Sequence, residues 1–242
     1  MLVIIAFFIL HWYFSLFFQT FFLHRYAAHG MFTMSKFWEK TFHIGAFLSQ
    51  GSSYLSPYAY GVMHKMHHAY ADTEKDPHSP KFDKTLMEMM FRTRKIYNEI
   101  STFKLKVTER FTLGVPSWHA FDLFAGNIWT RIVWALVYIL IYIKFAPSAW
   151  FFLLVPIHIA MGPVHGAIIN WFNHKFGYRN FEVSDTSTNL LPIEIFTLGE
   201  GLHNNHHKNG QNPNFAHKWF EFDPTYQIIK ILDFIKVIKL VK

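Results

Sequence analysis

Two long apolar blocks constrain the fold of this chain more than any other feature. Residues 1–23 are almost wholly apolar, and residues 129–172 form a second, longer block. About 20 apolar residues in a helix cross a bilayer, so the first block predicts one span. The second block predicts two spans, 129–145 and 147–172, with a turn at Ala146-Pro147-Ser148, because proline ends helices and begins new ones.

The composition agrees with a membrane protein. Charged residues are 16% of the 242, whereas a soluble domain has about 25%. The formal net charge is +7, but the basic residues do not gather on one polar face as in a protein that binds nucleic acid. We therefore expect a single all-α domain over residues 1–242, a polytopic membrane protein with three spans and no nucleic-acid partner.

The positive charges mark the predicted inner side of the membrane. Residues 24–131 contain 14 Lys or Arg and residues 173–242 contain 8, while the only other one is Lys144 in the hairpin turn. Lys and Arg accumulate in cytoplasmic segments. This predicts a cytoplasmic helical cap built from residues 24–128 and 173–242, on what we expect to be a bacterial inner membrane.

Three histidine motifs lie in the predicted cap. They read His24-Arg-Tyr-Ala-Ala-His29, His64-Lys-Met-His67-His68 and His203-Asn-Asn-His206-His207. Neutral imidazole is the commonest metal ligand among the side chains. The chain has no cysteine, so a bound metal must take nitrogen or oxygen ligands, which suits iron, copper or zinc.

Two further segments are expected at the membrane surface. Residues 41–63 are apolar but contain Gln50, Gly51 and Ser52, and a single crossing here would separate the first two histidine motifs. They are therefore expected to form interfacial helices, or to enter and leave on one side. Residues 230–242 are predicted to form a basic amphipathic helix against the membrane.

Helix geometry indicates which histidines can share a site. At about 100° per residue, the imidazoles of an HxxHH motif lie within about 100° of arc, on one face. His24 and His29 diverge by about 140° in an ideal helix, so either the helix ends between them or they approach a metal from different sides. Asn170 and His174 are four residues apart and share a face. Nine imidazoles exceed the needs of one ion, so the pattern predicts two, and iron with oxygen activation is favoured.

Three further segments extend the pattern. Residues 71–80 read Ala-Asp-Thr-Glu-Lys-Asp-Pro-His-Ser-Pro, residues 170–179 read Asn-Trp-Phe-Asn-His-Lys-Phe-Gly-Tyr-Arg, and residues 199–207 read Gly-Glu-Gly-Leu-His-Asn-Asn-His-His. These segments, in this order, resemble the D-T-x-x-D-P-H, N-x-x-x-H…G-Y-R and G-E-G-x-H-N-x-H-H segments of the integral-membrane fatty acid desaturases, the stearoyl-CoA desaturase-like group. The resemblance covers roughly residues 5–230.

The resemblance implies an oxidoreductase with a di-iron centre. Such an enzyme uses O2 and two electrons to insert a cis double bond into a saturated acyl chain, often at carbon 9. Asn170 would act on one iron through a water. The implied iron ligands are His24, His29, His64, His67, His68, His174, His203, His206 and His207, and their division between the two irons stays open.

The resemblance also implies partners. The electron donor would be a separate ferredoxin-like or cytochrome b5-like protein, drawn to the basic cap. The acyl carrier stays open between CoA, acyl carrier protein and an intact glycerolipid, because Tyr60-Gly61-Val62-Met63 lacks the charged groups that many CoA-using relatives carry before the second motif. The family usually has two spans before its first motif, and this chain has room for one.

Several residues are candidates for supporting roles. Arg92, Arg94 and Lys95 could bind the phosphates of the acyl carrier, and Phe8 with Trp12 could form the floor of an acyl tunnel. Second-sphere partners of ligand histidines, or helix caps, are expected at Asp72, Asp76 and Glu200. His78 is expected to stabilise a turn, and His158 and His165 to pack within a span.

Three other functions are compatible with parts of the pattern. A membrane di-iron lipid hydroxylase shares the oxidant and differs in its product, a gain of one oxygen instead of a loss of two hydrogens. A metal transporter or storage protein should place ligands at mid-membrane, and the motifs here lie at or beyond the span ends. A zinc hydrolase needs a catalytic carboxylate beside its ligands, and no HExxH is present.

Overall fold

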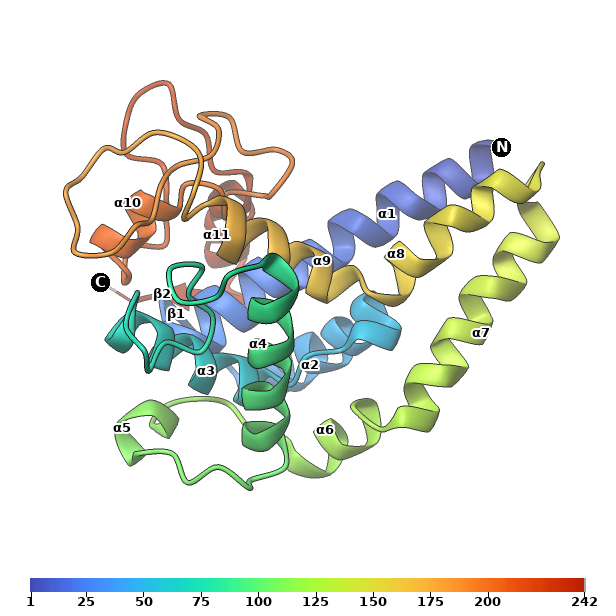
Figure 1. The fold of residues 1–242 in the computed structure, drawn as a ribbon, viewed down its shortest axis with the longest axis horizontal. Helices are drawn as coiled ribbons and strands as arrows, with labels where there is room; N and C mark the ends of the chain where they lie inside the picture. The colour runs from blue at the N-terminus through green and yellow to red at the C-terminus, as the bar shows by residue number, and fades with distance from the viewer. Residues whose placement is uncertain (242) are drawn as a thin grey trace.

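The computed structural model describes residues 1–241 and is predominantly helical (Figure 1). Two segments are long and apolar enough to cross a membrane alone, Leu2–Ala28 and Ile128–Phe145. Leu2–Ala28 consists of α1 (Leu2–Phe18) and the π-helix η1 (Gln19–Ala28), and Ile128–Phe145 is α7. These segments correspond to the spans predicted at 1–23 and 129–145.

The third predicted span is a bent pair of helical segments. Ala149–Ile159 and Met161–Phe172 pass the span test together, with a bend of 73° between them. They comprise η3 (Ala149–Leu154), α8 (Val155–Ile159), α9 (Met161–Ala167) and the π-helix η4 (Ile168–Phe172). Pro156 and Pro163 flank the break at Ala160, and proline removes an intrahelical hydrogen bond and crowds the preceding turn. The segment 147–172 is thus one broken span or a re-entrant loop.

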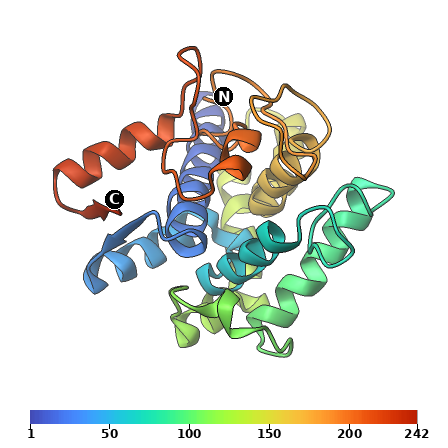
Figure 2. The same ribbon diagram turned by 90° about the vertical axis from the view of Figure 1, so that its left-hand side faces the viewer.

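Short helices and a two-stranded sheet make up the rest of the described chain. Figures 1 and 2 show most of these elements near the end of α1 that lies away from the N-terminus. They are β1 (Phe32–Met34), α2 (Lys36–Gln50), η2 (Gly51–Ser53), α3 (Pro57–Tyr70), α4 (Leu86–Ser101), α5 (Glu109–Thr112), α6 (His119–Ala125), α10 (His203–Lys208), α11 (Pro224–Phe234) and β2 (Ile238–Leu240). We call this set the cap.

Local sequence explains where the cap helices begin. Ser35, Ser56, Thr85 and Asp223 each precede a helix, and each side chain accepts a hydrogen bond from a backbone N–H in the first turn. Such caps satisfy amides that have no partner within the helix. The stretch 41–63 includes the end of α2, the η2 turn and the start of α3. It is a helix–turn–helix and does not form one continuous span.

The prediction of a helix over 230–242 is wrong beyond Phe234. There α11 ends, and Ile238–Leu240 pairs as β2 with β1 in an antiparallel register of Phe32 with Leu240. Phe32 and Ile238 are 1% and 3% exposed, so burial of apolar side chains on this small sheet outweighs continued helix. Position 242 lies outside the described residues.

Candidate metal centre

Nine histidine side chains converge in two adjacent groups, and they come from η1, α3, α10 and the turns that follow η1 and η4. The first group is His24, His29, His64, His68 and His206, and the second is His67, His174, His203 and His207. Within each group, one ring nitrogen of every member lies within 4.8 Å of those of the others. Spacing alone left the division of the nine open, and the structure divides them into five and four.

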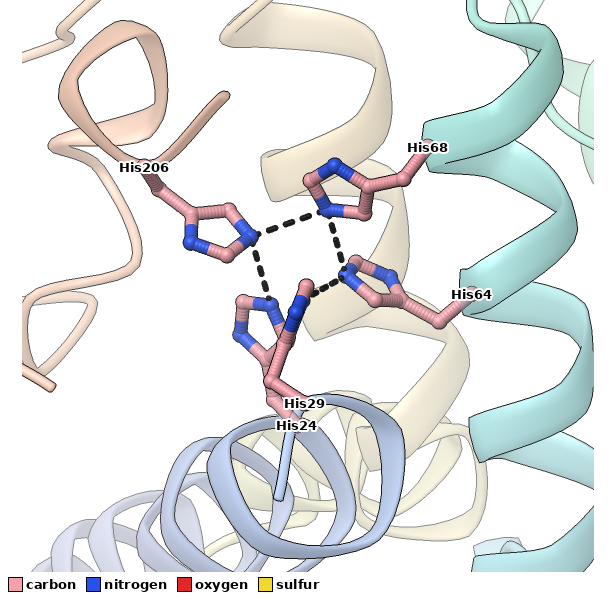
Figure 3. Close-up of side chains that lie close together, drawn as sticks. All are labelled: His24, His29, His64, His68 and His206. Carbon is pink, nitrogen blue, oxygen red and sulfur yellow. Dashed lines mark hydrogen bonds between the residues drawn. The ribbon is translucent and has the colours of Figure 1, made fainter. Parts of the chain in front are cut away.

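The rings of the first group face one another through their Nε2 atoms (Figure 3). The Nε2 atom of His64 lies 2.9 Å from those of His29 and His68. The Nε2 atom of His206 lies 2.9 Å from that of His68 and 3.0 Å from that of His24. Five nitrogens therefore surround one small volume, with no oxygen or sulfur atom in the set.

The rings of the second group also face one another through their Nε2 atoms. The Nε2 atoms of His67 and His207 are 3.3 Å apart, and those of His174 and His203 are 3.2 Å apart. His68 of the first group lies against His207 of the second, with ring centroids 4.6 Å apart. The two groups are therefore neighbours, as two ions that act together require.

The π-helix η1 brings His24 and His29 to one group. The N–H of His29 donates to the carbonyl of His24 at 3.2 Å, which is the i→i+5 bond of a π-helix. Residues five apart then lie one turn apart, on the same side. The helix end expected between the two residues is confirmed, because η1 ends at Ala28 and His29 follows it, whereas the π-helical bonding was not predicted.

Each HxxHH motif contributes to both groups. On α3, His64 and His68 enter the first group and His67 the second. On α10, His203 and His207 enter the second group and His206 the first. Residues four apart share a face of a helix, whereas the residue between them is turned aside, so each helix supplies both groups.

Carboxylates hold the outer nitrogen of three of the nine rings. The Nδ1 atom of His24 is 2.6 Å from Glu200, that of His67 is 2.9 Å from Asp76, and that of His207 is 2.9 Å from Asp185. A proton held on Nδ1 leaves the Nε2 lone pair free for a metal, and such partners are typical of metal-binding histidines. Glu200 and Asp76 are where the sequence predicted them.

Two residues that contact the ligand histidines belong to no recognisable sequence motif. Asp185 lies in a loop with no fixed spacing to any histidine, and Thr186, whose Oγ1 is 3.1 Å from Nδ1 of His174, follows it. Asp72 was predicted as a partner of a ligand histidine. Its carboxylate instead accepts hydrogen bonds from Ser79 Oγ and from the amide of Thr186, and so joins two loops of the site.

Burial favours the neutral form of seven of the nine imidazoles. Burial, followed by the neighbouring imidazoles, lowers the pKa well below its usual range for His29, His64, His68, His203, His206 and His207. Burial also lowers the pKa of His174 to about 4. Burial acts to raise the pKa of Glu200, but the charges and hydrogen bonds of His24, Arg25 and Thr20 outweigh it and lower that pKa. The site therefore presents neutral nitrogens beside ionised carboxylates, the protonation states that metal binding requires.

A buried polar chain ties α11 to the first group. Glu200 accepts a hydrogen bond from Thr20, Thr20 accepts one from Arg25 at 2.7 Å, and Arg25 pairs with Asp223 at 2.7 Å. Both members of the ion pair are 0% exposed at their side chains. Phe215 covers the Arg25 guanidinium at 3.9 Å from the ring centroid. No sequence pattern predicts a role for Arg25 or Asp223.

The other residues predicted for the site lie outside the two histidine groups. Asn170 lies on η4 and, within the described residues 1–241, its side chain makes no hydrogen bond to a histidine of either group. The Arg92 guanidinium pairs with Asp83 at 2.5 Å and binds the carbonyl of Asp76, whereas Arg94 and Lys95 are exposed. Arg92 thus braces the loop that carries Asp76.

The predicted floor residues Phe8 and Trp12 lie deep in the spans. Their ring centroids are 6.3 Å apart, and Trp12 packs edge-on against His165 and donates to the carbonyl of Phe196 at 3.3 Å. His158 contacts His11 at 2.6 Å and Tyr142 at 2.9 Å, which joins α8 to α1 and α7. This agrees with the packing role predicted for His158.

Comparison with known proteins agrees with the geometry. The family model "Fatty acid desaturase" matches residues 1–230. The chain is 31% identical over 227 residues to the sn-1 stearoyl-lipid 9-desaturase of Synechocystis sp., and covers 65% of that protein. It is 28% identical over 225 residues to the icosanoyl-CoA 5-desaturase of Limnanthes douglasii, and covers 56% of it.

A third relative has a similar name. The chain is 26% identical over 234 residues to the sn-1 stearoyl-lipid 9-desaturase of Anabaena variabilis, and covers 72% of that protein. The matched part is 86% of this chain for the Anabaena and Limnanthes proteins and 90% for the Synechocystis protein. The residues matched by the family model, 1–230, include both apolar blocks and all three histidine motifs. The chain belongs to the fatty acid desaturase family.

Proposed function

We propose that this protein is an O2-dependent fatty acyl desaturase that inserts a cis double bond, at carbon 9, into a saturated acyl chain. The observation that carries the proposal is the pair of adjacent imidazole groups, of five and four members, at the ends of the candidate spans. Two of the relatives compared are named 9-desaturases and one a 5-desaturase, which supports the reaction class and favours carbon 9.

The donor set fits two iron ions. Nine imidazole nitrogens and no thiolate suit iron in its ferrous state. Bound iron would supply the activation of O2 that removal of hydrogen from an unactivated methylene needs. Asn170 would act through a water, as the family resemblance implies.

The chain's own residues would position the ions and exclude water. Glu200, Asp76 and Asp185 fix the orientation of three rings, and most of the nine rings are buried. A rigid, dry site with fixed ligand orientation limits side reactions of a strong oxidant. The neighbouring spans would hold the acyl chain, and the methylene that reaches the ions would set the position of the double bond.

The substrate carrier and the cellular setting belong to the same proposal. An acyl-lipid or acyl-CoA substrate is supported by the names of the relatives, and an acyl carrier protein thioester is a further carrier class. We place the site on the cytoplasmic face of a bacterial inner membrane, on the distribution of Lys and Arg. A ferredoxin-like or cytochrome b5-like protein would supply electrons.

The test is expression in a host that lacks its own desaturase, followed by mass spectrometry of total fatty acids with localisation of the double bond. We expect products two hydrogens lighter than the saturated chain, unsaturated at carbon 9. His67→Ala and His206→Ala should abolish them, while His119→Ala, at an exposed position outside both groups, should not. Products heavier by one oxygen would make the protein a hydroxylase, and full activity in both histidine variants would overturn the assignment.

A further inference from the structure

The loop of residues 190–198, between η4 and α10, turns apolar side chains outward and polar ones inward. Ile193 and Ile195 are 58% and 53% exposed. Glu194 and Thr197 are 0% and 3% exposed, and the Thr197 hydroxyl donates to the Glu194 carboxylate. A loop surrounded by water is expected to have the opposite arrangement, because burial of apolar surface is favourable and burial of a polar group has a cost.

A second segment with the same inverted pattern pairs with this loop. Phe222 is 41% exposed, whereas Glu221 before it is buried. The amide of Phe222 donates to the carbonyl of Pro192 at 2.9 Å, and the amide of Glu194 donates to the carbonyl of Phe222 at 3.2 Å. This bridge sets Phe222 beside Ile193. We use the name outward apolar patch for the exposed side chains of Leu191, Ile193, Ile195, Phe196 and Phe222.

The outward apolar patch adjoins a membrane span. The indole N–H of Trp12 donates to the carbonyl of Phe196 at 3.3 Å, and the two rings lie 5.0 Å apart. Leu198, at the end of the loop, shares one buried apolar cluster with Trp12 of α1 and Met161 of α9. Trp12 lies near the middle of the segment Leu2–Ala28, about 24 Å from its cap-side end at a rise of about 1.5 Å per residue. The loop therefore runs alongside the spans.

The polar groups of the loop find partners inside the protein. Lipid offers no hydrogen bond, so peptide groups beside hydrocarbon need such partners. The carbonyls that accept a hydrogen bond from another part of the protein are those of Pro192, Glu194, Phe196 and Leu198. The amide of Leu191 donates to the Glu194 carboxylate at 2.9 Å. Residues 190–198 contain one ionisable side chain, and it is this inward carboxylate.

We propose that the outward apolar patch inserts into the hydrocarbon of the membrane, so that the 190–198 loop is a re-entrant lipid contact beside α1. Lipid is the occupant because the patch is continuous with a span. Trp219 and Lys218, both exposed, precede Phe222 in the chain, and tryptophan and lysine are typical of the boundary between membrane and water. The proposal rests on the spans and is independent of the reaction.

The loop leads directly into the third histidine motif. The Glu194 carboxylate lies against Gly201, where an added Cβ atom would clash with it, and the amide of Gly201 donates to Thr197 at 2.9 Å. Glu200, between the loop and the motif, contacts His24. Insertion of the patch therefore fixes the height of the metal centre relative to the lipid.

The experiment measures the surroundings of single labels. The chain has no cysteine, so one introduced cysteine carries the only label. Ile195→Cys and Phe222→Cys are each labelled with bimane in the iron-loaded full chain, in lipid nanodiscs. Phe14→Cys, exposed on α1, is the reference for lipid, and Leu113→Cys, an exposed apolar position after α5, is the matched control. Fluorescence is quenched separately by brominated phosphatidylcholine in the disc and by iodide in the buffer.

We expect brominated lipid to quench the labels at Ile195 and Phe222 as strongly as the label at Phe14, and iodide to leave all three bright. The label at Leu113 should show the reverse. Quenching by iodide alone at both patch positions would overturn the proposal. Protection from both quenchers would also overturn it, because a second copy or another protein would then cover the patch. Size-exclusion chromatography checks folding, and Leu191→Cys, exposed in the same patch, replaces a variant that does not elute with the wild type.

Discussion

At the scale of single side chains, the centre depends on which ring nitrogen each histidine presents. The Nδ1 atoms of His24, His67 and His207 contact buried carboxylates, and their Nε2 atoms face other imidazoles. The neighbour of each ring therefore determines its tautomer. Single substitutions at the carboxylates should weaken one group selectively, without removing any ligand.

Glu200→Gln is the clearest case of such a substitution. The amide keeps the size of the carboxylate but loses its charge, and the loss of such partners typically lowers metal affinity about 10- to 100-fold. We expect one of two binding steps in a ferrous or cobalt titration to weaken by that amount. Glu88→Gln, at an exposed position, is the control. Two unchanged binding steps in Glu200→Gln would contradict the role of this carboxylate.

The division of the nine histidines into two groups leads to a second prediction. His206→Ala removes a member of the first group and His203→Ala a member of the second. Each variant should lose about half of the bound iron, because metal affinity depends on the ligand number of its own site. Metal analysis of the purified variants measures this. If both variants keep the wild-type iron content, the two groups are not the iron sites.

Trp12→Ala tests the predicted tunnel floor. Trp12 is 8% exposed and packs against His165 and Phe196, so its truncation would open space deep between the spans. We expect the preferred substrate to lengthen, as read from the chain lengths of unsaturated products in the expression host. Phe14→Ala, at an exposed position of the same helix, should leave the profile unaltered. An unchanged profile in Trp12→Ala would remove this residue from the tunnel.

At the scale of elements, the sequence predicts what local patterns determine. The apolar blocks are sufficient to predict α1, α7 and the broken third segment, since length and hydropathy alone define a span. The histidine spacing predicts which residues meet. The π-helical turn of η1 escaped prediction because HxxxxH looks the same in sequence whichever helix type carries it, and i→i+5 bonding depends on packing around it.

Pairs of residues that are distant in sequence account for the other site features that were not predicted. Asp185 and His207 are 22 residues apart, and Arg25 and Asp223 are 198 apart, so no spacing rule connects them. Arg92 was assigned to phosphate binding because it lies in a basic cluster, but Asp83 already occupies its guanidinium. A role in phosphate binding remains a prediction for Arg94 and Lys95.

The ion pair of Arg25 with Asp223 joins η1 to α11, and its removal should affect stability. Asp223→Ala leaves a guanidinium buried without its partner and also removes the cap of α11. Breaking a buried pair typically costs about 3–5 kcal/mol. We expect a clear fall of the unfolding midpoint in detergent, measured by differential scanning fluorimetry. Lys230→Ala, exposed on the same helix, is the control, and equal midpoints would show that the pair contributes little.

At the scale of the whole molecule, the spans and the cap differ in what stabilises them. The spans expose large apolar residues such as Leu10, Phe14 and Leu140, as expected of a surface that faces lipid. The cap buries charged and polar groups around neutral imidazoles. The metal-free cap should therefore depend strongly on pH.

The sign of this dependence follows from the direction of the pKa shifts. Seven of the nine imidazoles have a pKa near 6.5 when unfolded and well below it when folded, about 4 for His174. Between these values the unfolded state binds more protons, so the free energy of unfolding falls as the pH falls, by up to about 1.4 kcal/mol per pH unit for each such histidine. We expect the midpoint of the metal-free protein to drop between pH 7.5 and 5.

His203→Gln should make this drop smaller, because it removes one buried titrating group. His119→Gln, at an exposed position, should leave the slope as in the wild type. Thermal unfolding of metal-free protein at several pH values measures both. A midpoint that stays constant from pH 7.5 to 5 would contradict the neutral, buried state of the imidazoles.

The crossed contribution of α3 and α10 has a consequence for how the centre can be taken apart. Each helix donates to both groups, so displacement of either helix disturbs the two sites together, and neither half of the cap can hold a complete site alone. A mononuclear form of this scaffold is therefore accessible only by replacing individual side chains. Such forms would isolate the chemistry of each ion within an intact protein framework.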